Sequence, residues 1–180
     1  MERYGLNLLL SREEIAFIIK GLADQISKDY RERELVMVCI LKGAFMFLSD
    51  LVRQLQISVQ IDFVRLASYG AGMETSGKVE VTKDIEIPIE GKDVLIIEDI
   101  IDSGRTLLFL KNRLALLNPR SIKVCALLDK KARREVQIEA EYLGKEVDDV
   151  FVVGYGIDVN ETYRNLPEIY YVTPVDHHKE

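Results

Sequence analysis

The residues best suited to chemistry lie in one stretch, from Val94 to Thr106, which reads VLIIEDIIDSGRT. Its three acids, Glu98, Asp99 and Asp102, could bind hydroxyl groups, a cation or a proton. The Ser-Gly-Arg-Thr run that follows offers hydroxyls and backbone N–H groups, which suit a phosphate. Three carboxylates would repel a phosphorylated ligand unless they bind another part of it. A sugar phosphate accompanied by Mg²⁺ would give each of these groups a partner.

The residues around the acids predict the elements that position them. Val94 to Ile97 do not alternate with polar residues, which is typical of a strand buried on both faces of a parallel sheet. Gly104 allows a tight turn, and the apolar stripe of a helix follows, at Leu107, Leu108, Leu110, Leu114 and Leu117. Ligands of open α/β sheets bind at such strand-to-helix junctions, beside the positive end of the helix dipole. A plainer alternative is that Asp102 or Ser103 only caps this helix.

A second strand-to-helix junction carries a cation in place of acids. Leu35 to Leu41 predicts another buried strand, Lys42-Gly43 ends it, and Ala44 to Leu55 predicts a helix. Lys42 either faces an anion or is a solvated loop lysine. Before this junction, the run from Ser11 to Glu14 is a capping box, and it predicts an amphipathic helix with apolar residues at Ile15, Ile18, Ile19, Leu22 and Ile26.

The middle of the chain predicts strands around a glycine-rich segment. Ile57, Val59, Ile61 and Phe63 alternate with polar residues, which indicates a strand with one wet face. Residues 67–78 contain three glycines and few large apolar residues, so they form either a flexible connection or a lid over a site. Val79–Val81 and Ile85–Ile89 predict the returning strands, with Pro88 favouring a sheet edge.

The C-terminal half continues the alternation. Ile122 to Leu128 predicts the next parallel strand, and its end runs into a charged segment, Asp129 to Arg134, whose plainest reading is a solvated basic turn. Residues 140–149 predict a polar connection. Phe151 to Asp158 predicts a final strand that ends in an acid.

Composition limits the class of protein. The 180 residues are 48% hydrophobic and 30% charged, which predicts one globular domain. A net charge of −6 argues against non-specific nucleic-acid binding. Cys39 and Cys125 lie in apolar runs, so we expect reduced core residues in a reducing compartment. No apolar run has the length of a signal peptide core or a membrane span, which makes a cytoplasmic protein the expectation.

The Val94–Thr106 stretch closely resembles the diphosphate-sugar signature of the type I phosphoribosyltransferases, and EDIIDSG is similar to the hypoxanthine-guanine branch of that family. The resemblance covers residues 1–180. It implies an α/β fold, the type I phosphoribosyltransferase fold, with a mostly parallel sheet flanked by helices. It also implies a single domain whose small hood is made from the N-terminal segment and the C-terminal strands.

The activity that the resemblance implies belongs to purine salvage. The phosphoribosyl group of phosphoribosyl diphosphate passes to hypoxanthine or guanine, a 6-oxopurine, and IMP or GMP and pyrophosphate are formed with the help of Mg²⁺. The implied partners are these small molecules and a second copy of the chain in a homodimer or homotetramer, with no nucleic acid and no membrane.

The resemblance also assigns roles to residues. Glu98 and Asp99 would hold the ribose, and the 5′-phosphate would be wrapped by Asp102, Ser103, Gly104, Arg105 and Thr106. Asp102 would be the general base at the purine. Lys42, Gly43 and Arg164 would bind pyrophosphate, and Ser68 and Tyr69 match the family's closing loop. The purine would contact Lys130, Phe151, Val152 and Asp158, and Mg²⁺ would be reached through Glu98, Asp99 and Asp158.

Two departures and two alternatives accompany the resemblance. Val159 stands where family members often carry Tyr, and Arg105 stands where relatives have Lys or other residues. Proteins of this fold also act as regulators that bind the diphosphate sugar without turnover, although such a protein should carry a nucleic-acid surface. An enzyme of the same fold that uses xanthine or another base is the other alternative.

Overall fold

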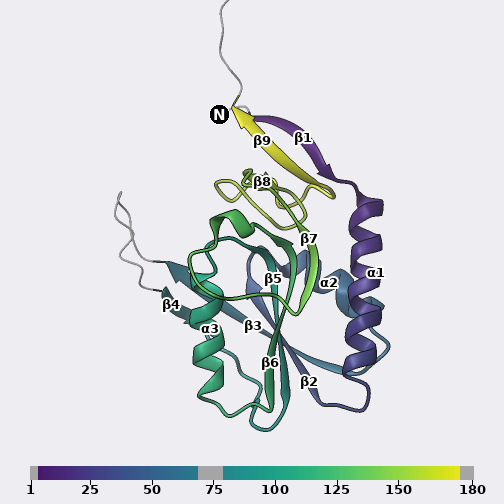
Figure 1. The fold of residues 1–180 in the computed structure, drawn as a ribbon, viewed down its shortest axis with the longest axis vertical. Helices are drawn as coiled ribbons and strands as arrows, with labels where there is room; N and C mark the ends of the chain where they lie inside the picture. The colour runs from purple at the N-terminus through teal and green to yellow at the C-terminus, as the bar shows by residue number, and fades with distance from the viewer. Residues whose placement is uncertain (1–3, 69–78, 175–180) are drawn as a thin grey trace, which may run out of the picture.

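The computed structural model describes residues 4–68 and 79–174, and within them the chain forms two β-sheets and three long helices (Figure 1). The large sheet contains β2 (Leu35–Leu41), β3 (Val59–Ser68), β4 (Val79–Lys83), β5 (Asp93–Ile101), β6 (Ser121–Asp129) and β7 (Tyr142–Glu146). These strands lie in the order β4-β3-β2-β5-β6-β7. Every neighbouring pair is parallel except β3 and β4. The predicted α/β fold with a mostly parallel sheet is confirmed.

Helices cover both faces of the sheet because side chains alternate along its buried strands. The helices α1 (Arg12–Asp29) and α2 (Phe45–Gln54) pack on the face that carries Met37 and Leu95. The helix α3 (Arg105–Ala115) packs on the opposite face, against Val38 and Ile96. In Figure 1, α3 accordingly lies on the other side of the sheet from α1. This layering leaves the carboxyl ends of the central strands uncovered by these helices.

The capping box that the sequence predicts is present at the start of α1. The Oγ of Ser11 accepts a hydrogen bond from Glu14 N at 3.2 Å. Glu14 in turn accepts one from Ser11 N at 2.8 Å. None of the three helices is long and apolar enough to cross a membrane within the ranges described.

A small antiparallel sheet forms the predicted hood. It consists of β1 (Tyr4–Leu10), β9 (Ile169–Pro174) and β8 (Val152–Val153), in the order β1-β9-β8. Figure 1 shows β1 and β9 side by side above the large sheet, although they come from opposite ends of the chain. Leu10, Val152 and Ile169 belong to the same buried cluster as Met37 and Leu95. The two sheets therefore share one hydrophobic core.

The prediction of a strand at Ile85–Ile89 is wrong, whereas Val59 and Phe63 of β3 pack against the core as predicted, and the opposite face of β3 is buried in part as well. Ile61 is 39% exposed, whereas Asp62 is only 5% exposed. The Oδ2 of Asp62 accepts hydrogen bonds from Glu86 N at 2.6 Å and Ile87 N at 2.7 Å. The backbone amides of Glu86 and Ile87 thus donate to a carboxylate and not to a neighbouring strand. A buried acid thus replaces the expected strand pairing.

The segment after β6 also differs from the prediction. Residues 140–149 are not only a connection, because they contain β7, and Lys131–Arg133 form a short 3₁₀-helix, η1. Gly144 allows β7 to lie close to β6, since a Cβ there would be 2.5 Å from the Leu127 carbonyl oxygen. The strand predicted over Phe151–Asp158 is limited to β8. The chain then turns at Gly154 and Gly156, which both have a φ of +99°.

Candidate active site

The residues that the sequence singled out lie around one edge of the large sheet, where three central strands end. β2, β5 and β6 are parallel neighbours, and their carboxyl ends carry Lys42, the acidic pair Glu98-Asp99, and Lys130 respectively. Parallel strands bring such ends together whatever their separation in the sequence. The strand-to-loop junctions predicted from the sequence therefore lie at one edge of the sheet.

Glu98 is a buried acid at this edge, with 9% of its surface exposed. Burial raises the pKa of its carboxyl well above the ordinary value, and the negative charge of Asp99 raises it further. Asp99 N lies 3.3 Å from the Glu98 carboxylate, and Asp99 itself accepts a hydrogen bond from Ile100 N at 2.9 Å. Neither acid has a Lys or Arg ion-pair partner in the described ranges. A cation or ligand hydroxyls would relieve this concentration of negative charge.

The acidic residues also test whether the chain fits the implied Mg²⁺. Among the described residues, no three His, Cys, Asp or Glu side chains converge as a metal-binding group. Mg²⁺ commonly takes only one or two protein carboxylates and completes its shell with water and substrate phosphates. The adjacent Glu98 and Asp99 have the donor chemistry for such a shared site.

The loop from Ile101 to Thr106 joins β5 to α3 and lines a cavity of about 230 Å³. Its polar lining comes from Glu98, Asp102, Ser103, Gly104 and Thr106. Gly104 has a φ of +82°, and a Cβ there would lie 2.7 Å from Ile138 Cγ2, so both backbone and packing require glycine. Gly104 is also the N-cap residue, which supplies no side-chain hydrogen bond to the helix. The α3 N-terminus therefore faces this cavity with donors that an anion can use.

Asp102 and Ser103 differ in how far they fit the capping alternative. The Oδ1 of Asp102 lies 3.2 Å from Arg133 Nε, so this carboxylate binds a guanidinium and not the helix end. Ser103 Oγ does accept a long hydrogen bond, 3.4 Å, from Arg105 N. The Arg105 guanidinium is paired with Glu135 at 2.5 Å. Capping thus describes part of the role of Ser103 but not that of Asp102.

Gly43 is the point where the loops of the site meet. The Leu41–Lys42 peptide that precedes it is cis. A Cβ at Gly43 would lie 1.7 Å from Asp99 Oδ2, and a Cβ at Gly156 would lie 2.1 Å from the Gly43 carbonyl oxygen. The β2–α2 loop is therefore in tight contact with both the acidic pair and the C-terminal turn, and a Cβ at either position would force a neighbouring group to move.

A cluster of four charged residues lies beside Gly43. Arg164 Nη2 is 2.8 Å from Asp158 Oδ1 and 3.3 Å from Glu161 Oε2, and Arg164 Nη1 donates to the Gly156 carbonyl at 2.7 Å. Lys42 Nζ lies 2.7 Å from the same Glu161 oxygen. The structure thus brings Lys42, Asp158 and Arg164 together. Sequence reasoning missed Glu161, because an acid in a polar turn carries no signal of its own.

Lys130 follows β6 and contacts the end of β5. Lys130 is 6% exposed, and its backbone N donates to the Ile101 carbonyl at 2.9 Å. It forms no ion pair with any acid of the described ranges. Val152 is buried in β8, whereas Phe151 is 54% exposed. Sequence reasoning also missed the role of Arg133, which it treated as part of a solvated basic turn.

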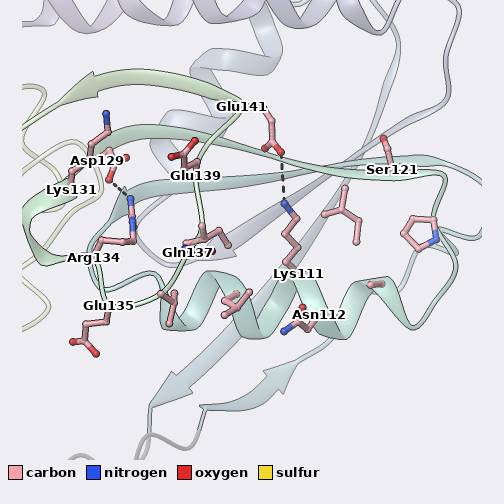
Figure 2. A pocket seen from close by; sticks show the side chains of 16 residues that line it. Lys111, Asn112, Ser121, Asp129, Lys131, Arg134, Glu135, Gln137, Glu139 and Glu141 are labelled. Atoms are coloured by element: carbon pink, nitrogen blue, oxygen red, sulfur yellow. Dashed lines mark hydrogen bonds and ion pairs between the residues drawn. The ribbon is translucent and has the colours of Figure 1, made fainter.

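Two features lie apart from this group. The backbone of Ser68 ends β3, and Tyr69 falls outside the described residues, so the closing-loop assignment stays a prediction. A larger cavity, about 1130 Å³, lies between α3, β6 and residues 134–141, as Figure 2 shows. None of the site residues predicted from the sequence lines it. Its labelled charges include pairs within the lining, Lys111 with Glu141 and Arg134 with Asp129.

Comparison with known proteins agrees with this geometry. Residues 7–160 match the family model described as a phosphoribosyl transferase domain. The chain is 46% identical to the hypoxanthine-guanine phosphoribosyltransferase of Aquifex aeolicus over 93% of this chain and 94% of that protein. It is 44% identical to the hypoxanthine phosphoribosyltransferase of Escherichia coli K12, over 93% and 95% of the two chains.

Solved structures agree as well. The crystal structure of a Staphylococcus aureus hypoxanthine phosphoribosyltransferase superposes with a TM-score of 0.90 at 46% identity, covering 93% of this chain and 91% of that one. A Trypanosoma cruzi hypoxanthine phosphoribosyl transferase gives a TM-score of 0.90 at 37% identity, with 97% and 94% covered. The fold, the loop at the end of β5 and these matches lead to one conclusion: the chain belongs to the phosphoribosyltransferase family.

Proposed function

We propose that this protein transfers the 5-phosphoribosyl group of phosphoribosyl diphosphate to hypoxanthine or guanine, and so forms IMP or GMP and pyrophosphate in purine salvage. The observation that carries the proposal is the meeting of an acidic pair, a helix N-terminus whose N-cap is glycine, and a lysine–arginine pair at one sheet edge. A ribose, a 5′-phosphate and a pyrophosphate require these three kinds of group together. The curated relatives reported above are named for this activity.

The sugar phosphate would lie along the β5–α3 loop. Glu98 and Asp99 would accept hydrogen bonds from the ribose hydroxyls, which are donors that a carboxylate pair can use. The 5′-phosphate would enter the cavity beside Ser103, Gly104 and Thr106, where hydroxyls and helix N–H groups converge. Arg105 would contribute through its backbone, since its guanidinium is paired with Glu135.

The pyrophosphate group would lie against the β2–α2 loop, where Lys42, the Gly43 backbone and Arg164 offer positive charge. One or two carboxylates among Glu98, Asp99 and Asp158 would hold Mg²⁺, which when bound would neutralise charge on the diphosphate. The C1′–O bond breaks with its electron pair leaving on pyrophosphate, and C1′ becomes oxocarbenium-like. Lys42 and Arg164 stabilise the charge that develops on the leaving oxygen.

The purine would attack C1′ through N9, with the Lys130 ammonium donating to its C6 oxygen. Phe151 would cover the ring, and the backbone near Val152 and Asp158 would meet its C2 edge. Asp102 would accept the proton that N7 loses as N9 forms the new bond. Atoms balance, since the base gains the phosphoribosyl group and loses one proton.

One assay tests the proposal directly. The protein is incubated with phosphoribosyl diphosphate, Mg²⁺ and each of hypoxanthine, guanine, xanthine and adenine, and nucleotide formation is followed. Turnover with the first two bases is expected. Binding of the diphosphate sugar without turnover of any base would favour a regulator, and preferential use of xanthine would favour another enzyme of the same fold.

We also infer the molecular setting of the activity. The shared core of the two sheets supports one domain over residues 1–180. Cys39 and Cys125 are both free and buried, as predicted, and this fits a reducing compartment such as the cytoplasm. A homodimer or homotetramer remains our prediction from the family resemblance, and light scattering behind a sizing column would measure it.

A further inference from the structure

Glu161 occupies a place between the two cations assigned to pyrophosphate. A single oxygen, Oε2, lies 2.7 Å from Lys42 Nζ and 3.3 Å from Arg164 Nη2. These cations come from segments more than a hundred residues apart in the chain, and Glu161 bridges them. The carboxylate thus supplies, in the ligand-free protein, the negative charge that a diphosphate would bring.

The backbone around Glu161 forms a tight turn that presents this side chain. Glu161 N donates to Asp158 Oδ2 at 2.8 Å, and Thr162 Oγ1 donates to the Val159 carbonyl at 2.6 Å. Asn160, Glu161 and Tyr163 have φ values of +49°, +60° and +71°, a left-handed conformation that non-glycine residues rarely adopt. Three such residues within four positions persist only where the surrounding contacts hold them.

The charge balance of the cluster explains why an anion must compete with Glu161. Lys42 and Arg164 carry two positive charges, and Asp158 already neutralises part of the arginine at 2.8 Å. A pyrophosphate that binds the same nitrogens competes with the Glu161 carboxylate, because both anions draw on the same two positive charges. Arg164 also keeps a buried Nε without a hydrogen-bond partner in the described ranges, so the carboxylate does not saturate its donors.

We propose that Glu161 is an internal competitor of pyrophosphate, which neutralises Lys42 and Arg164 when the site is empty and lowers its affinity for the diphosphate. The proposal rests on the proposed function, which assigns these two cations to pyrophosphate. Its consequence for the reaction is faster product release, since the carboxylate returns to the cations as pyrophosphate leaves. Glu161 contacts no reacting atom and acts through Lys42 and Arg164.

The test is calorimetric titration of the full chain with pyrophosphate, with and without Mg²⁺. Glu161→Gln keeps the size of the side chain and removes its charge, so pyrophosphate should bind roughly 3- to 5-fold more tightly in both conditions, the range expected when the ion pairs of one exposed carboxylate are lost. The matched control is Glu86→Gln. Glu86 is also exposed and paired with a lysine, Lys83 at 2.9 Å, but it belongs to the segment after β4. It should leave pyrophosphate affinity unchanged.

Unchanged or weaker binding by Glu161→Gln would overturn the proposal, and weaker binding only with Mg²⁺ would make Glu161 a metal contact. Thermal unfolding of each variant shows whether the turn is intact, and Glu161→Asp provides a second variant whose shorter carboxylate should give an intermediate affinity. In a Lys42→Met background the effect of Glu161→Gln should shrink. If Lys42→Met does not weaken pyrophosphate binding at all, the proposed pyrophosphate site itself is wrong.

Discussion

At the scale of single residues, Asp102 is the side chain whose surroundings say most about its role. It follows the buried end of β5, its side chain is half exposed beside the cavity at the α3 N-terminus, and it caps no helix. Asp102→Asn keeps its shape and removes the proton acceptor. We expect kcat to fall ~10²-fold or more with little change in the affinity for phosphoribosyl diphosphate. Steady-state kinetics and a binding titration measure the two effects, and unchanged turnover at neutral pH would exclude Asp102 as the base.

The position of Lys130 leads to a prediction about which purine bases the protein accepts. Its buried ammonium can donate hydrogen bonds but accept none. Hypoxanthine and guanine present an oxygen at C6, whereas adenine presents an amino group, so a donor would meet a donor and adenine should be rejected by orders of magnitude. We expect xanthine to rank between them, because its C2 oxygen would face backbone carbonyls.

A competition assay with the four bases measures this ranking. Lys130→Ala should reduce the discrimination against adenine. Lys131→Ala is the control, since Lys131 is exposed and paired with Glu146 at 2.7 Å, and it should leave the ratios unchanged. If the unmodified protein uses adenine and hypoxanthine equally, and Lys130→Ala does not alter their ratio, then Lys130 does not contact the base.

The same residues show what a sequence can predict about a site. Lys42, Glu98, Asp99 and Lys130 could be placed together because each follows an apolar run typical of a buried parallel strand, and such strands end at one edge. The burial of Asp62 could not be predicted. An acid that alternates with apolar residues along a strand is expected to be exposed, and the loop whose amides donate to Asp62 is known only from the structure. Glu161 was missed for a related reason, since its partner Lys42 is distant in the chain.

At the scale of elements, the strand and helix predictions succeeded for segments that are buried along most of their length. They failed where the hydrogen bonds of one side chain determine the local backbone structure. β2 and β5 have unbroken apolar runs, β6 has one from Val124 to Leu128, and the structure has all three strands. Residues 85–89 are apolar enough for a strand, but Asp62 takes their amides. β7 lies at the edge of the sheet, where half-polar sequences such as Tyr142–Glu146 resemble connections.

The contact between the β2–α2 loop and the end of β5 is the element-scale feature most open to test. Gly43→Ala would place a Cβ 1.7 Å from Asp99 Oδ2, so the acid or the loop must shift. A displacement of about 1 Å in a positioning group can cost ~10²-fold in rate, and we expect kcat/KM to fall by at least that factor.

Gly21→Ala is the matched control for this change. Gly21 lies within α1, and a Cβ there meets nothing within 4 Å. Alanine should raise the free energy of unfolding by up to ~1 kcal/mol through helix propensity and leave kcat/KM unchanged. Kinetics and urea unfolding compare the two variants. Normal activity of Gly43→Ala would mean that the loop and Asp99 need not lie in contact.

At the scale of the whole molecule, buried acids are paired differently at the two ends of the parallel strands. The candidate site lies at the carboxyl ends of these strands, and the amino ends lie at the opposite edge of the sheet. At the carboxyl end of β5, burial and the negative charge of Asp99 raise the pKa of Glu98, because two acids lie together there without a cation among the described residues. At the amino end of β5, Asp93 is fully buried but fully paired. Ser121 Oγ donates to it at 2.6 Å, Arg33 lies 3.6 Å away, and Arg120 donates to its second oxygen. Asp93 thus has the partners that Glu98 lacks within the described part of the chain.

Asp93 therefore predicts how the stability of the protein depends on pH. The hydrogen bond from Arg120 lowers the pKa of Asp93 below the 3.8 of an exposed aspartate, although burial acts in the opposite direction. An acid with a lowered folded pKa contributes stability above its unfolded pKa and loses that stability as the pH falls through the folded value. The contribution of Asp93 should be complete at pH 7 and decline below about pH 3.8.

Asp93→Asn removes this contribution and should lower the free energy of unfolding at pH 7 by about 2 kcal/mol, the scale of a lost hydrogen bond to a charged group. Urea unfolding from pH 7 to pH 3 measures the free energy of unfolding of both proteins. The difference between these free energies should narrow below about pH 4, because only the unmodified protein loses the stabilisation that the Asp93 carboxylate provides. Asp148→Asn, at an exposed acid, should show no such gap. A gap for Asp93→Asn that stays constant down to pH 3 would mean that its effect comes from packing and not from the paired charge.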